Sequence, residues 1–191
     1  MSRSYPASLD PALASPQERL ARLSRRMEWV TTVGIVLIVV LVGLAFVIPD
    51  WSRNLLLSRL GATGAKLPLG PSDQIVLAMI YAVPLGIMIW GLWQVRALFR
   101  DFAAGHVFTG DAAQRLRLFG LSVLLQGPLG PLTATVLALV LSLGNPPGQR
   151  YLVLTFSIND YVALIVGGVL IAIAAVMREA VRLADENAAF V

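Results

Sequence analysis

LFGLSVLLQGPLGPLTATVLALVLSL, residues 118–143, determines how the rest of the chain is to be interpreted. It has no Asp, Glu, Lys or Arg, and it is longer than the ~20 residues with which a helix crosses about 30 Å of hydrocarbon. Two Gly-Pro pairs, 127–128 and 130–131, interrupt it. If these pairs formed a loop, each remaining piece would be too short to cross a bilayer, and the charge balance of the last span would be reversed. We therefore expect one membrane-spanning helix with an internal bend.

Three further apolar runs, 30–48, 75–93 and 161–177, have similar lengths and no interior charge. The chain as a whole is 57% hydrophobic and 14% charged, with a mean hydropathy of +0.76, which is far from the composition of a soluble domain. A membrane β-barrel would need alternating segments of about 10 residues, and that pattern is absent from the sequence. The predicted fold class is all-α, a bundle of four transmembrane helices.

The distribution of Lys and Arg predicts the orientation in the membrane. Eleven of these residues fall on the side that holds both termini and the connection 94–117, and four fall on the other side. The eleven are Arg3, Arg19, Arg22, Arg25, Arg26, Arg96, Arg100, Arg115, Arg117, Arg178 and Arg182; the four are Arg53, Arg59, Lys66 and Arg150. By the positive-inside rule, both termini are expected in the cytoplasm, with the chain in the cytoplasmic membrane. The net charge of +4 is then a topology signal, and we expect no direct binding to nucleic acid.

The chain divides into a tail, a juxtamembrane segment and a membrane domain. Residues 1–14 are expected to be a mobile cytoplasmic tail, and 188–191 a short C-terminal one. Residues 15–28 place Leu20, Leu23 and Met27 on one helical face and arginines on the opposite face. We expect this amphipathic helix to lie along the membrane surface before the four-span domain, 29–187, begins. The run 30–48 is longer than a typical signal-peptide core, so it is expected to remain as an anchor.

Two connections between spans have structural signals. Residues 151–158 favour an extended strand that would pair with the first external loop and form a small β-like cap, although periodicity alone does not establish it. On the cytoplasmic side, the second span is expected to continue as a helix to Gly105, and Thr109 to cap the next helix. This hairpin carries Arg96, Arg100, Arg115 and Arg117. These arginines are interpreted either as positive-inside anchors or as a surface that docks an acidic cytoplasmic partner.

The prolines of the second and third spans predict that both helices have unpaired backbone carbonyl groups at the same depth in the membrane. Counted from the cytoplasmic ends of their spans, Pro84 and Pro128 both lie about 14 to 15 Å deep, and each removes one backbone hydrogen bond. Freed carbonyl groups at that depth must be covered by protein or water. This level has two interpretations. It is either a pocket or hinge, or a static kink whose carbonyl groups accept hydrogen bonds from neighbouring side chains. The candidate residues are Tyr81, Pro84, Gln126, Gly127, Pro128, Pro131, Thr133 and Thr135.

Catalytic and metal chemistry has little support in this sequence. There is no cysteine, so thiol redox chemistry and thiolate metal sites are excluded, and the one histidine, His106, lies in the cytoplasmic turn. Asn159 and Asp160 are expected to cap the last span at the external interface. We therefore expect no enzyme activity, no metal and no cofactor. Two stripes of small residues on the last span indicate either packing within the bundle or a homo-oligomer: Ala163, Gly167 and Ala174, and Gly168, Ala172 and Ala175.

Three short patterns carry a resemblance to a known family. They are Gly-x-x-Phe-Thr at 105–109, Asn-Asp at 159–160 and Leu-x-x-Glu-Asn at 183–187. With the surrounding spans two to four, they resemble a family of bacterial four-span membrane proteins known as domain of unknown function twenty-nine seventy-five. Residues 110–112, Gly-Asp-Ala, depart from the Glu-Asn of that pattern. The resemblance implies proteins often encoded beside a small helix-turn-helix regulator, by association only.

These observations lead to one preferred function and two others. The preferred function is a non-enzymatic membrane sensor or anchor that signals to a cytoplasmic partner, with a helix-turn-helix regulator as one candidate. The alternative is a small permease or transporter subunit with a mid-membrane site at the bends of spans two and three. The third is an immunity or structural membrane protein that binds no ligand.

Overall fold

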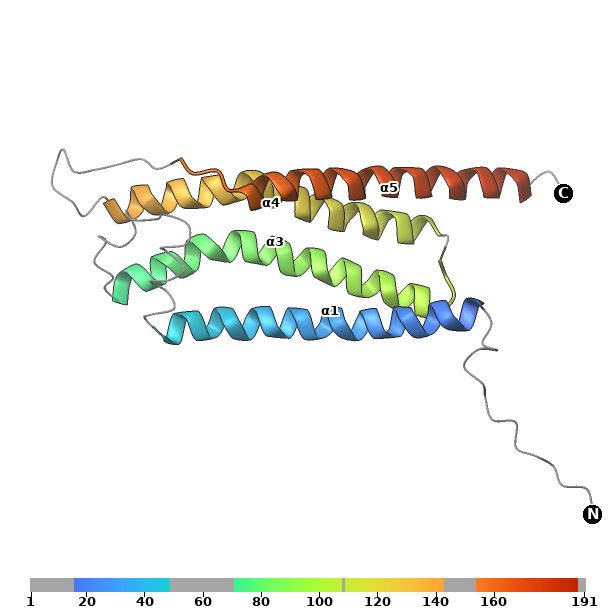
Figure 1. The fold of residues 1–191 in the computed structure, drawn as a ribbon, viewed down its shortest axis with the longest axis horizontal. Coiled ribbons are helices and arrows are strands. Elements are labelled where there is room, and N and C mark those ends of the chain that lie inside the picture. Colours follow the sequence, from blue (N-terminus) through green and yellow to red (C-terminus); the bar gives the residue numbers. More distant parts are fainter. Residues whose placement is uncertain (1–15, 49–70, 108, 143–153, 189–191) are drawn as a thin grey trace, which may run out of the picture.

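The computed structural model describes residues 16–48, 71–107, 109–142 and 154–188, and these form four long helices (Figure 1). The helices are α1 (Pro16–Val47), α3 (Pro71–Ala103), α4 (Gly110–Ser142) and α5 (Ile158–Ala188). Each contains a stretch long and apolar enough to cross a membrane. The described ranges contain no strand; most of the expected external cap lies outside them, and 154–157 are irregular. The prediction of an all-α protein with four transmembrane helices is confirmed.

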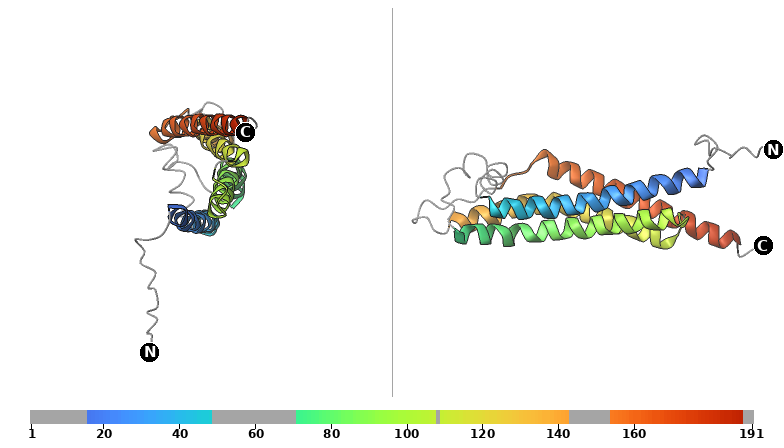
Figure 2. Two further views of the ribbon diagram at one scale, coloured as in Figure 1. Left: turned by 90° about the vertical axis from the view of Figure 1, so that its right-hand side faces the viewer. Right: turned by 90° about the horizontal axis from the view of Figure 1, so that it is seen from below.

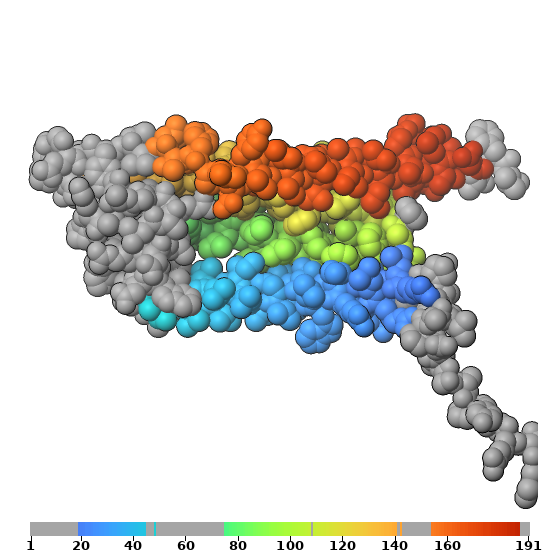
Figure 3. Space-filling model, viewed as in Figure 1, coloured from blue at the N-terminus to red at the C-terminus, as the bar shows by residue number. Residues whose placement is uncertain are grey.

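Helix contacts follow the order of the chain. Helix α1 packs on α3, α3 on α4 and α4 on α5, and the last pair has the most extensive contact. Seen end on, the helices form an open arc with α1 and α5 at its two ends (Figure 2). Figure 3 looks into the hollow side of this arc, where α3 and α4 form the floor between α1 and α5. Throughout the arc, large apolar side chains such as Val36, Val83, Leu132 and Val169 are exposed, as expected for helices whose solvent is lipid.

Helix α1 differs from the expectation in one respect. Residues 16–28 do not form a separate surface helix, because α1 runs without interruption from Pro16 to Val47 (Figure 1). At the expected junction, the Thr31 and Thr32 hydroxyls donate to the carbonyls of Met27 and Glu28, each at 2.8 Å. The sequence there has no Pro or Gly, so the helical ladder continues and the amphipathic segment becomes a straight extension of the span.

The cytoplasmic hairpin of the prediction is present between α3 and α4. Helix α3 ends at Ala103, and Gly105 follows with a φ of 90°, a left-handed conformation that closes many helix ends. Thr109 caps α4 because its Oγ1 accepts a hydrogen bond from the Ala112 amide at 3.2 Å. Asp111 lies in the first turn of α4, where the helix dipole favours an anion. We refer to this end of the molecule as the hairpin end.

The Gly-Pro pairs lie inside a continuous helix. Pro128 and Pro131 are interior residues of α4, and Pro84 is an interior residue of α3. Both helices change direction near the middle of their length (Figure 1). The Gly-Pro pairs therefore lie within one helix, as the length and charge of residues 118–143 predicted.

Candidate functional site

A polar contact joins the two bent helices. The side-chain Nε2 of Gln126, on α4, donates a hydrogen bond of 2.8 Å to the backbone carbonyl of Pro84, on α3. One turn of α4 closer to the hairpin, Ser122 is fully buried and packs where Gly91 of α3 has no side chain. The two bent helices therefore contact each other directly at Pro84 of α3 and Gln126 of α4.

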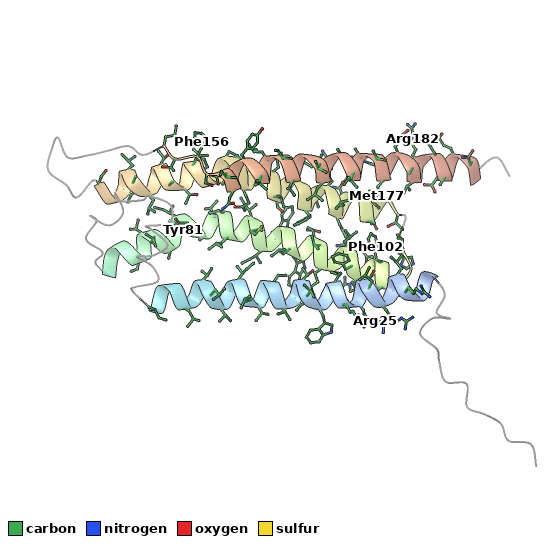
Figure 4. All side chains as sticks on the ribbon, viewed as in Figure 1. Arg25, Tyr81, Phe102, Phe156, Met177 and Arg182 are labelled. Carbon is green, nitrogen blue, oxygen red and sulfur yellow. The ribbon has the colours of Figure 1, made fainter. Side chains whose placement is uncertain are left out.

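The remaining candidate residues of the predicted pocket have different surroundings. Gly127 and Gly130 face α5: a Cβ on Gly127 would lie 3.0 Å from the Asp160 carbonyl oxygen, and one on Gly130 would lie 2.8 Å from the Asp160 Cγ. Thr135 donates to the carbonyl of Pro131 within its own helix at 2.8 Å. Pro128 is exposed, whereas Pro131 and Thr133 are buried. Tyr81 is half-buried on α3 (Figure 4).

Asp160 forms the cap that starts α5. Its Oδ2 accepts from the Ser157 amide at 2.8 Å, and its own amide donates to the Ser157 Oγ at 3.3 Å. This reciprocal pair is a capping box with Asp in place of the usual Glu. The carboxylate is buried, with 6% of the residue exposed, against the bare backbone of Gly130. The capping contact expected of Asp160 is present, whereas Asn159, the other residue expected to cap this span, is exposed. The Ser-x-x-Asp spacing at 157–160 was the sequence signal for the partner of Asp160.

The level of Asp160 differs from the expectation. Helices α4 and α5 approach each other at Gly130 with Asp160, at Leu124 with Gly167 and at Gly120 with Ile171. Helix α4 continues from Gly130 to Ser142, which is about 18 Å at 1.5 Å per residue. Asp160 therefore lies well inside the bundle and not at the external edge of α4. This offset cannot be predicted from the sequence, because the register of two helices depends on their packing.

The same register shifts α5 toward the hairpin end. Continued along the pair, it sets Gly110 of α4 level with Val181 of α5. The last residues of α5, up to Ala188, then extend about 10 Å beyond the start of α4. Figure 1 shows α1 and α5 both reaching past the hairpin.

The predicted arginine surface is divided between paired and exposed side chains. The Nε of Arg115 lies 3.0 Å from the Asp101 Oδ2 across the hairpin, in an ion pair that is about 30% exposed. The Arg96 guanidinium lies 5.2 Å from the centroid of the Trp93 ring, a cation–π contact. Arg100 and Arg117 are exposed. The structure therefore places all four at the hairpin end, with two of them presented outward.

The charges at the end of α5 are compensated within the helix. Arg182 contacts Glu179 at 2.7 Å and Glu186 at 3.5 Å, and its side chain points away from the bundle (Figure 4). Surface pairs of this kind contribute little to stability. They also reduce the net positive charge at this corner of the hairpin end.

The two small-residue stripes of α5 have different environments. Gly167 lies against the backbone of Leu124, and Ala174 is fully buried, so this stripe packs within the bundle. A Cβ on Gly168 would meet no atom within 4 Å, and Ala172 and Ala175 are exposed. The second stripe therefore faces outward.

Comparison with known proteins assigns the chain to a family. The family model "Protein of unknown function (DUF2975)" matches residues 13–191, so the chain belongs to this family. The match includes α1, which the three sequence patterns did not cover. No curated protein and no solved structure matches the chain. The fold and the family together define a multi-pass membrane protein with four candidate transmembrane helices.

Proposed function

We propose that this protein is a non-enzymatic sensor or anchor of the bacterial inner membrane that holds a cytoplasmic partner at its hairpin end. The observation that carries the proposal is the gathering of chain ends and charge there. The start of α1, the α3–α4 hairpin and the end of α5 lie at one end of the molecule (Figure 1). At that end Arg100 and Arg117 are exposed on adjacent helices. An excess of arginine beside spans supports a cytoplasmic location for both termini.

The expected partner has an acidic surface. Exposed guanidinium groups pair with carboxylates and steer the approach of an acidic protein. The resemblance to proteins encoded beside helix-turn-helix regulators makes such a regulator the first candidate. The protein would then act on nucleic acid only through that partner.

Co-purification from native membranes tests this proposal. The full chain is isolated in mild detergent, and the cytoplasmic protein that accompanies it is quantified for wild type and for the double variant Arg100→Gln, Arg117→Gln. We expect the double variant to lose most of the partner. Arg182→Gln is the control, because Arg182 is already paired within α5 and its loss should leave the complex intact. Wild-type protein without a stoichiometric companion, or a companion retained by the double variant, would contradict the proposal.

A permease or transporter subunit is the second candidate function, and one observation favours it. The carboxylate of Asp160 is buried at the level of the α4 bend, and an ionisable group inside a membrane bundle is often part of an ion or proton pathway. Helices that begin inside the membrane are also typical of transporter sites. Proteoliposomes loaded with a pH-sensitive dye test this: wild type should dissipate an imposed proton gradient faster than Asp160→Asn. Equal rates, at the level of empty liposomes, would rule the proton route out.

A further inference from the structure

We propose that an apolar stripe on the first turns of α1 docks an amphipathic acidic helix of the cytoplasmic partner. The stripe consists of Leu20, Leu23 and Met27, with exposed fractions of 40%, 53% and 38%. Spacings of three and four residues place these side chains on one face of the helix. The inference rests on the proposed function, since it describes how the same partner binds.

Lipid does not reach most of this stripe. The uncharged run of α1 begins at Val30, and α1 continues straight from it toward Pro16 (Figure 1). Leu23 and Leu20 are therefore about 10 and 15 Å beyond the hydrocarbon edge at 1.5 Å per residue. The headgroup layer adds only about 5 to 8 Å on each side of a bilayer. Leu20 and Leu23 therefore lie outside the bilayer, where water or another protein surrounds them.

The packing of the bundle leaves the stripe open. Ser24, beside Leu23, is only 2% exposed, so the adjacent face of α1 is covered. The helix packed against α1 is α3, and the far wall of the hollow side is α5 (Figure 2). A partner helix laid along the stripe would therefore bury the apolar surface that the arc leaves uncovered at the hairpin end.

The positive charge around the stripe favours an acidic partner helix. The other faces of the same turns carry Arg19, Arg22, Arg25 and Arg26, and the side chain of Glu28 is the acidic group that the structure describes there. A second copy of this chain would bring two such arginine-rich helices together, and like charges oppose that contact. A helix with leucines on one face and glutamates on its flanks complements both the stripe and the arginines.

Peptide binding to the full chain in phosphatidylcholine nanodiscs tests the inference. The probe is a fluorescent peptide of ~18 residues with leucines on one helical face and glutamates elsewhere. A scrambled peptide of the same composition and a version with lysine in place of glutamate are the peptide controls. We expect the probe to bind best, and the double variant Leu20→Ser, Leu23→Ser to weaken binding by about tenfold or more. Leu183→Ser, an exposed leucine near the end of α5, should leave the affinity unchanged.

The results separate this inference from the proposed function. If the scrambled peptide binds as well as the probe, docking is purely electrostatic. Docking on the apolar stripe is then refuted, and binding to the exposed arginines of the hairpin end remains possible. Equal affinity of wild type and the double serine variant refutes the stripe in the same way. If neither acidic peptide binds, docking on the stripe is also refuted. The co-purification experiment then decides the proposed function independently.

A spin label distinguishes a membrane-covered stripe from one that awaits a partner. The chain has no cysteine, so Leu23→Cys provides a unique labelling position. We expect the label to be accessible to a water-soluble nickel reagent in nanodiscs. Because Leu23 is itself part of the stripe, the acidic peptide is added at a concentration that saturates the labelled variant, and the label should then become protected. Accessibility to oxygen together with protection from nickel before peptide addition would mean that lipid covers the stripe, and the inference would be wrong.

Discussion

Helix α4 contacts its two neighbours in different ways. Toward α3 it presents side chains: Gln126 donates to the Pro84 carbonyl, and the Ser122 side chain lies over Gly91. Toward α5 the backbones themselves come close: a Cβ on Gly167 would lie 2.6 Å from the Leu124 Cα, and one on Gly120 would lie 3.0 Å from the Ile171 amide nitrogen. The first interface can adjust by rotating side chains, whereas the second requires the absence of side chains.

This difference explains why the α4–α5 contact is the most extensive of the bundle. Helices in a membrane have no hydrophobic driving force toward one another, so close backbone approach and dispersion contacts hold them together. Glycine permits that approach, and rigid backbone atoms cannot move aside for a new methyl group. We therefore expect substitutions in the α4–α5 interface to cost more stability than those in the α3–α4 interface.

The largest effect is expected from Gly167→Ala. The new methyl group would overlap backbone atoms of Leu124, so α4 and α5 must separate. We expect a loss of about 3 kcal/mol or more in the free energy of unfolding, measured by denaturation with SDS in mixed micelles. Gly168→Ala is the matched control, because no atom lies within 4 Å of that position; it should be neutral or slightly stabilising. Equal losses for both variants would contradict the backbone contact.

Gly130→Ala should have the next largest effect. Its methyl group would collide with the carboxylate of Asp160 and displace it from the Ser157 amide. We expect a loss of about 1 to 3 kcal/mol, because overpacking and the lost cap act together. Thermal unfolding in detergent provides the measurement, with Gly86→Ala, in open space on α3, as the control. If Gly130→Ala costs little further stability in an Asp160→Ala background, the collision is confirmed as the cause.

Gln126→Leu is expected to have a smaller effect. It removes one hydrogen bond between α3 and α4 while keeping the volume, and such bonds in membrane bundles contribute about 0.6 to 1 kcal/mol. A folded protein with slightly lower thermal stability is the expected outcome. Thr135→Val, which removes a hydrogen bond within α4 alone, is the comparison. Unchanged stability for Gln126→Leu, with no change of phenotype, would contradict both a stabilising role of the Gln126–Pro84 hydrogen bond and the mid-membrane pocket.

The smallest effect is expected at the hairpin. Asp101→Asn weakens the ion pair with Arg115, and pairs that are partly exposed to water contribute about 0.5 kcal/mol or less. The change should be close to the detection limit of thermal unfolding and should vanish at high salt. A loss comparable with that of Gly130→Ala would show that the hairpin contributes much more to stability than its exposure implies.

Much of the architecture followed from the sequence because it depends on composition and on local signals. Four uncharged runs predicted four spans, the length of residues 118–143 placed the Gly-Pro pairs inside a helix, and Gly105 and Thr109 marked the hairpin. The contact of Gln126 with Pro84 lies in reach of such reasoning, since depth can be counted along each span. The continuity of α1 through residues 16–28 did not follow from the sequence, because an amphipathic segment is compatible with either a bent or a straight path.

The sequence by itself determined that this chain lives in a membrane, crosses it four times and collects its arginines near one end, because the transfer of apolar and charged groups between lipid and water depends on residue type. Only the tertiary structure decided which faces of the helices meet. It set the register that carries Asp160 inward to Gly130, turned Gly127 toward α5 and away from Gln126, and opened the arc between α1 and α5. These features depend on the shapes of surfaces distant in sequence, and small residues on two helices match only when both helices are in place.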